Sequence, residues 1–233
     1  PPGTFTMGSP ANEPGRGGDE TPHTVTLTHG FYLGKYEVTQ AQYETVMNGN
    51  PAGLTADPSQ YKGSNRPVER VSWNDVQVFL TRLNDMEQTA GRLPAGWKYV
   101  LPTEAQWEYA CGAGTTTEYS WGDTISASDA NWDHGSDANR PVEVGMYAPN
   151  AWGFHDMSGN VAEWTSNAFD ESAFSYAHDM NSDYHYNASE DDHPVLKRKV
   201  IRGGSWKDIA YFIQNSTRTY EYQDTAKCYI GFR

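Results

Sequence analysis

The stretch VIRGGSWKDIAYFIQ, residues 200–214, has the composition most typical of a functional loop. Its glycine pair and tryptophan indicate a tightly built turn, because glycine reaches backbone conformations closed to other residues. Ser205 could be the hydroxyl of a hydrolytic triad, but no nucleophile elbow surrounds it. The residues after Asp208 carry no other nucleophile or redox group. The loop is therefore either an active site or the frame of one without its chemistry.

The stretch HDMNSDYHYNASEDDH, residues 178–193, mixes histidine with acidic residues and invites a metal interpretation. His178 and His185 lie in an expected loop, where their spacing fixes no coordination geometry. We interpret the segment as part of a solvated, acidic surface insertion over residues 170–193. The basic residues 197–199 that follow are expected to pair with this acidic insertion or to meet a partner protein.

Three helices and several short strands are expected to position these residues. Each helix follows a candidate N-cap residue: Thr39, Ser72 and Thr103. The helix over 72–88 carries one apolar stripe at i, i+3, i+4 and i+7: Val76, Phe79, Leu80 and Leu83. Polar and apolar residues alternate in FTMGS and HTVTLT, which predicts half-buried strands, and FYLGKYEV is expected to form a third.

Composition limits the class of protein. The chain has 233 residues, 22 Gly, 13 Pro, 8 Trp and 15 Tyr, which favours an irregular aromatic core over long regular elements. No linker separates two cores, so a single domain over 1–233 is expected, and no apolar run has the length of a membrane span. The net charge of −13 disfavours nucleic-acid binding, which depends on Lys and Arg at phosphates.

Seven short pieces occur in order along the chain: GTFTMGS, KYEVTQAQY, PVERVSWNDV, LPTEAQWEYA, NAWGFHDMSGNVAEW, RGGSW and GFR. Together they resemble the formylglycine-generating enzyme (sulfatase-modifying factor) superfamily over essentially the whole chain. The resemblance implies an irregular α+β fold related to C-type lectins, with little regular secondary structure.

The same resemblance draws attention to the position of the family's chemistry. Formylglycine-generating enzymes bind copper(I) through two cysteines just beyond RGGS, because a soft ion requires soft thiolate ligands. The matching positions here are Asp208 and Ile213, so copper is not expected. Ser205 and Trp206 are expected to line the retained groove with them. Ala162 replaces a tryptophan that many of the enzymes carry near it.

The two cysteines, Cys111 and Cys228, could form one bridge at most. In the family, the cysteine that Cys111 matches pairs with one downstream, and Arg218 stands at that partner's position. The resemblance therefore implies that Cys111 is a buried free thiol.

The resemblance also implies structural calcium, which prefers oxygen ligands. The residues carried over to one site are Asp156, Gly159, Val161 and Glu163, and to a second site Asn131, Trp132 and Asp137. The alternative for the first set is a turn capped by Asp156 and a salt bridge from Glu163.

The C-terminal third looks more specifically like the gliding-motility and type IX secretion lipoproteins of Bacteroidota (GldK/PorK type). That resemblance implies a non-catalytic scaffold in a homo-oligomer or ring with other secretion components, periplasmic and associated with the outer membrane. Two alternatives stay open. One is an enzyme, either a formylglycine-generating oxidase or a relative with altered chemistry. The other is a lectin-like, diversified ligand-binding module whose variable positions lie between RGGSW and GFR.

Overall fold

The structure is a computed structural model that describes residues 1–135, 140–176 and 184–233. It confirms the predicted α+β class with little regular structure. Six strands form two sheets, and three α-helices and three short 3-10 helices complete the described elements.

The strands form an N-terminal hairpin and a mixed central sheet. In the hairpin, β1 (Gly3–Met7) pairs antiparallel with β2 (His23–Leu27). The alternating pattern predicts both strands. The central sheet has the order β5-β4-β3-β6, and only the β3–β6 pair is parallel. Its strands are β3 (Ala162–Ala168), β4 (Arg198–Arg202), β5 (Arg218–Tyr222) and β6 (Ile230–Gly231).

All three predicted helices are present: α1 (Gln40–Met47), α2 (Trp73–Thr89) and α3 (Glu104–Gly112). Thr39, Ser72 and Thr103 each cap one of them in a complete capping box. The box satisfies backbone N–H groups that the first turn leaves without partners. These local signals explain why the helix starts were predictable.

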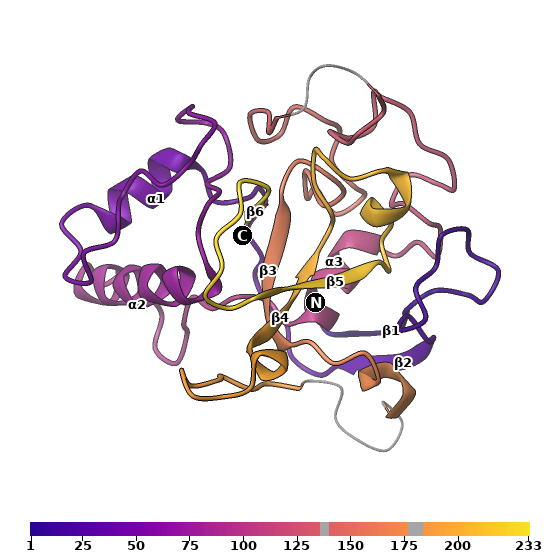
Figure 1. Cartoon of the computed structure of the whole chain (residues 1–233), viewed down its shortest axis with the longest axis horizontal. Coiled ribbons are helices and arrows are strands. Elements are labelled where there is room, and N and C mark those ends of the chain that lie inside the picture. The colour runs from indigo at the N-terminus through magenta and orange to yellow at the C-terminus, as the bar shows by residue number, and fades with distance from the viewer. Residues whose placement is uncertain (136–139, 177–183) are drawn as a thin grey trace.

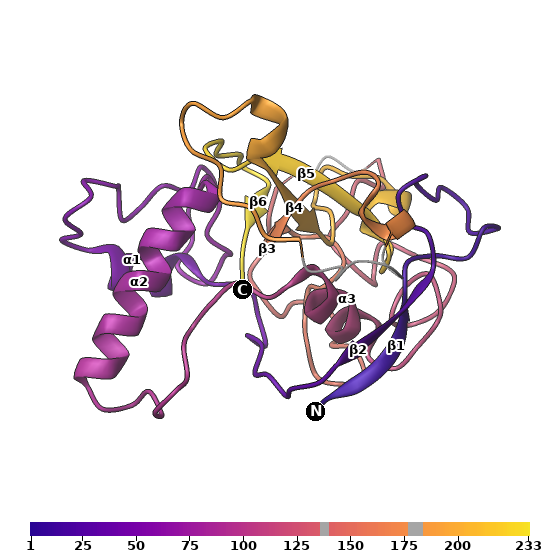
Figure 2. The same ribbon diagram turned by 90° about the horizontal axis from the view of Figure 1, so that it is seen from below.

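The helices occupy two places around the central sheet (Figures 1 and 2). α1 and α2 pack together at one side, and their apolar faces meet residues of β3, β4 and β6 in the main core. Tyr43 of α1 stacks on Phe79 of α2 at 5.3 Å between ring centroids. α3 lies between the central sheet and the β1–β2 hairpin.

The predicted strand over residues 31–38 is absent: the segment runs as an irregular extended connection. Its backbone joins the C-terminal segment at one point, where the Val38 N–H donates to the Phe232 carbonyl at 2.8 Å. The chain bends at Lys35 and Tyr36, so the segment does not stay extended along a neighbouring strand. Among the described residues, no helix is both long and apolar enough to cross a membrane.

Three 3-10 helices lie in the loops: η1 (Ala173–Tyr176), η2 (Pro194–Lys197) and η3 (Ala210–Ile213). Of these, η3 follows the RGGSW loop directly.

Candidate functional site

The glycine pair after β4 is required by close contacts. Gly203 has φ +85°, and a Cβ there would lie 2.8 Å from the Met157 carbonyl oxygen. Gly204 has φ +59°, and its Cβ would lie 2.4 Å from the Phe212 carbonyl oxygen. Since any side chain would collide with backbone, this turn brings β4 directly against η3.

Ser205 and Asp208 close the turn that follows. The Asp208 carboxylate accepts from the Ser205 hydroxyl at 2.7 Å and from the Ser205 N–H at 3.0 Å. Its other oxygen pairs with Lys207 at 2.6 Å. Ser205 is fully buried, so its hydroxyl serves the turn.

Ile213 and Trp206 have structural surroundings as well. Ile213 is fully buried and packs with Tyr119 and Ala130. The backbone N–H of Trp206 donates to the Asn160 carbonyl at 2.9 Å, and its ring meets the edge of Tyr61. The four predicted groove residues therefore surround one turn, of which Trp206 and Asp208 are partly exposed.

η3 presents a group of exposed apolar side chains, which we call the η3 surface: Ile209, Tyr211 and Phe212, each 47–49% exposed. The helix beneath them is fixed, because the Tyr119 hydroxyl donates to the Ala210 carbonyl at 2.9 Å. The Thr217 hydroxyl donates to the Tyr211 carbonyl at 2.8 Å. These two hydrogen bonds hold the backbone that carries the η3 surface.

Of the residues carried over as calcium ligands, Asp156, Gly159 and Val161 lie in the turn before β3, and Glu163 lies in β3 itself. Asp156 and Glu163 form a buried acidic cluster with Glu37. The Glu163 carboxylate accepts from Arg233 through both oxygens and from the Trp107 indole N–H at 2.7 Å. Glu163 therefore takes part in the salt bridge that the sequence left as an alternative.

Asp156 keeps an oxygen without a protein partner. One oxygen accepts from the Gly145 N–H at 2.6 Å, whereas Oδ1 is buried with no hydrogen bond among the described residues. Burial raises the pKa of Asp156. A small cavity of about 10 Å³, the space of one water molecule or ion, opens onto this residue.

Glu37 is the member of the cluster that sequence reasoning missed. Burial, followed by the charges of Asp156 and Glu163, raises its pKa well above the ordinary value. One oxygen accepts from the Asn160 side-chain amide at 3.0 Å. The available signal was that Glu37 is the one carboxylate in FYLGKYEV, a segment that the sequence predicts to be a strand.

Asn160 joins the segments around this cluster. Its side-chain oxygen accepts from the Val142 N–H at 2.9 Å and from the Asn131 amide at 3.2 Å. Its backbone N–H donates to the Asn131 carbonyl at 2.8 Å. The residue has φ +63°, a conformation that asparagine tolerates better than most residues.

Of the second predicted calcium set, Asn131 contacts Asn160, and Trp132 packs with the cluster of Tyr119 and Ile213. The Asn131 amide also donates to the Arg140 carbonyl at 3.0 Å, and the Trp132 carbonyl accepts from the His134 N–H at 3.1 Å. Asp137 lies outside the described residues. Within those residues, no three His, Cys, Asp or Glu side chains form a metal-binding group, so a cation would need backbone or amide oxygens in addition to at most two such side chains.

Cys111 is a buried free thiol, as predicted. Burial raises its pKa to about 12, and its sulfur lies 3.1 Å from the Asn215 side-chain oxygen. Arg218 instead forms a buried ion pair with Glu104 at 2.8 Å. Burial alone would raise the pKa of Glu104, but Arg218 and Arg202 overcome this effect and hold it below the ordinary value.

The basic run before RGGSW divides between surface and core. Arg198 pairs with Glu171 of the acidic insertion at 3.2 Å, as expected. Lys199, in contrast, is fully buried and donates to the Tyr186 carbonyl and the Asn187 side chain. His178 lies outside the described residues.

Known proteins similar to this chain include enzymes and a chaperone. The chain is 33% identical to "Chaperone protein LppX" of Paenibacillus barcinonensis over 60% of this chain and 62% of that protein, less than two thirds of its length. It is 24% identical to the mouse formylglycine-generating enzyme over 100% of this chain and 73% of the enzyme. It is 28% identical to hercynine oxygenase of Mycolicibacterium smegmatis over 100% of this chain and 59% of that protein.

Solved structures share the architecture. PvdO from Pseudomonas aeruginosa superposes with a TM-score of 0.79 at 26% identity, covering 100% of this chain and 90% of that one. The Treponema denticola variable protein 1 has a TM-score of 0.67 at 23% identity, covering 99% and 91%, which shows the fold alone. The Sulfatase-modifying factor enzyme 1-like domain matches residues 1–233, and the chain therefore belongs to that family.

Proposed function

We propose that this chain is a non-catalytic member of its family that acts as a protein-binding or assembly subunit. The proposal depends on the structural roles of Asp208 and Ile213, the residues at the positions of the copper-binding cysteines. One carboxylate closes the Ser205 turn, and one aliphatic side chain fills the core beneath η3. No pair of thiolates stands where the copper-dependent relatives carry theirs.

An oxidase assay tests whether the chain oxidises a substrate cysteine. A peptide with the sulfatase motif Cys-x-Pro-x-Arg, incubated with the protein, copper(I) and oxygen, is expected to keep its cysteine, as followed by mass spectrometry. The Asp208→Cys/Ile213→Cys double variant tests copper binding at the matching positions. Turnover by the unaltered chain would overturn the proposal.

The η3 surface is the proposed contact with a partner, and the first candidate is a second copy of this chain. Three apolar side chains held outward on a fixed helix favour burial against another protein. Light scattering after size-exclusion chromatography is expected to show association that Phe212→Asp abolishes. Trp152→Asp, a change at a comparably exposed aromatic residue, is the control. A monomer at every concentration would contradict self-assembly.

The closer setting we propose is the secretion and gliding apparatus that the C-terminal third resembles, with the protein outside the cytoplasm and close to an outer membrane. The support is the sequence between residues 156 and 233. Co-purification with the ring components from a bacterium that encodes them, lost on Phe212→Asp, tests this placement.

We also propose that calcium occupies the cluster beside Asp156, with Glu37 in place of Glu163. Glu163 is already neutralised by Arg233, whereas Asp156 has a buried free oxygen and the pKa of Glu37 is raised. A divalent cation would offset the repulsion between these two carboxylates. Calcium is expected to raise the unfolding temperature of the wild type over EDTA and to leave that of Glu37→Gln unchanged. An equal rise in both would contradict this site.

A further inference from the structure

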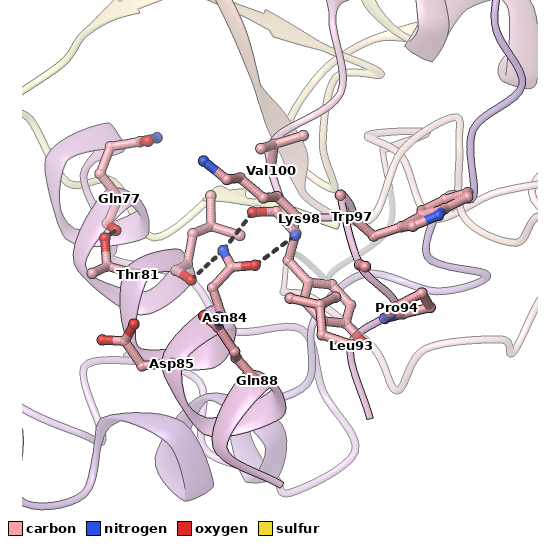
Figure 3. Close-up of a pocket in the computed structure, with 14 residues that line it drawn as sticks. Gln77, Thr81, Asn84, Asp85, Gln88, Leu93, Pro94, Trp97, Lys98 and Val100 are labelled. Atoms are coloured by element: carbon pink, nitrogen blue, oxygen red, sulfur yellow. Dashed lines mark hydrogen bonds between the residues drawn. The ribbon is translucent and has the colours of Figure 1, made fainter. Parts of the chain in front are cut away.

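A groove lies between α2 and the loop of residues 93–100, away from the η3 surface (Figure 3). Its volume is about 600 Å³, within the range of about 300–1,000 Å³ typical of small-molecule sites. No residue of the η3 surface or of the acidic cluster lines it.

The two walls of the groove are held together by Asn84. Its side-chain amide donates to the Leu80 carbonyl and to the Tyr99 carbonyl, each at 2.8 Å. Its side-chain oxygen accepts from the Tyr99 N–H, also at 2.8 Å. The loop is therefore fixed against the helix without a ligand, which lowers the ordering cost of binding.

Four polar side chains that line the groove have no protein partner. The side chains of Gln77, Asp85, Gln88 and Lys98 make no hydrogen bond or ion pair within the described parts of the chain. Figure 3 shows Lys98 extending from the loop toward the Gln77 side of the helix. The groove thus offers a pure donor, a pure acceptor and two amides that both donate and accept.

The groove is also neutral and partly apolar. Among the described residues, Asp85 and Lys98 are the only charged ones that line it, so the charges of the lining cancel although the chain has a net charge of −13. Leu93 and Tyr99 add apolar surface, and the Tyr99 side chain is 43% exposed. An anionic or a cationic ligand would therefore gain little electrostatic binding energy in this groove.

We propose that this groove binds a neutral oligosaccharide. Sugar hydroxyls both donate and accept hydrogen bonds and can satisfy all four free side chains, while the C–H face of a sugar ring packs on Tyr99. A proline-rich segment would fit the apolar wall, but proline lacks the N–H that Asp85 requires.

The test is calorimetric titration of the whole chain with neutral hexasaccharides of glucose, N-acetylglucosamine, mannose, xylose and galactose. At least one is expected to bind, and Tyr99→Ala and Gln88→Ala are each expected to weaken binding at least about fivefold. Both side chains are exposed, so neither change threatens the fold. Tyr220→Ala, a tyrosine 39% exposed on β5, is expected to bind like the wild type.

The proposal is overturned if no hexasaccharide binds below about 10 mM. It is also overturned if both groove variants bind unchanged, or if a proline-rich peptide or an anionic glycan competes more strongly than every neutral one. Phe212→Asp, which tests the proposed assembly function, is expected to leave glycan binding intact. Failure of either proposal can therefore be seen without the other.

Discussion

Lys199 is a buried cation with no carboxylate partner among the residues that the structure describes. Its ammonium lies 3.9 Å from the centre of the Trp73 ring and donates to the Tyr186 carbonyl and the Asn187 side chain. Burial lowers its pKa to about 8. Neutral oxygens and an aromatic face therefore replace only part of the solvation that the ammonium loses.

This burial predicts a stability that rises with pH. Between the folded pKa of about 8 and an unfolded value of about 10.4, the unfolded chain binds more protons, so the free energy of unfolding increases as the pH rises. Urea titrations at pH 7.5 and 10 are expected to show about 2 kcal/mol more rise in the free energy of unfolding for the wild type than for Lys199→Met. Lys62→Met, at an exposed surface pair, should retain the wild-type rise.

The Asn160 amide predicts a second pH effect, of opposite direction. In Asn160→Asp a carboxylate faces the buried Glu37, so the variant should lose about 3–5 kcal/mol of stability at pH 8. Because both acids would have raised folded pKa values, the loss should shrink as the pH falls toward 5. Asn65→Asp, in an exposed loop, is the control for denaturant titrations. A loss independent of pH would contradict charge repulsion as its cause.

At the scale of the elements, the start of α2 depends on Ser72. Its hydroxyl accepts from the Asp75 N–H, and the Asp75 carboxylate accepts from the Ser72 N–H. Ser72→Ala should lower the free energy of unfolding by about 1 kcal/mol, whereas Ser72→Thr should retain most of it. Equal losses in the two variants would show that packing, not the cap, determines the effect.

The same capping signals explain which elements could be predicted from the sequence. The helix starts, the two N-terminal strands and the buried thiol at Cys111 depend on neighbouring residues or on a family motif. The segment around Glu37 could not be predicted as observed, since its partners Asn160 and Phe232 are far away in the chain. The burial of Lys199 could not be predicted for the same reason. Residues 197–199 form a basic run that is typical of a surface, and only the pairing of β4 between β3 and β5 places Lys199 inside.

Across the whole molecule, Arg218 ties distant segments together. It pairs with Glu104 of α3, donates to the Asp170 carbonyl at 3.0 Å, and lies against the rings of Phe169 and Phe174. The single side chain thus joins the central sheet, α3 and the chain that leaves β3. It occupies the place where the family resemblance puts the second half of a disulfide.

Removing this tie should destabilise the whole fold. Arg218→Met leaves a buried carboxylate with one weaker partner and should cost about 3–5 kcal/mol at pH 7. Because the pKa of Glu104 is held low by the arginines, the loss should diminish as the pH falls below the ordinary glutamate value. Arg92→Met, at an exposed pair, should change the denaturant midpoint little. A comparable loss in both variants would contradict the burial argument.

The parallel pairing of β6 with β3 has a consequence for synthesis on the ribosome. Residues 230–231 supply that edge of the sheet, and Arg233 neutralises the buried Glu163. A nascent chain that has emerged only as far as β5 therefore has an incomplete sheet and an uncompensated carboxylate in its core. The domain acquires its native packing only after residue 233 has left the exit tunnel.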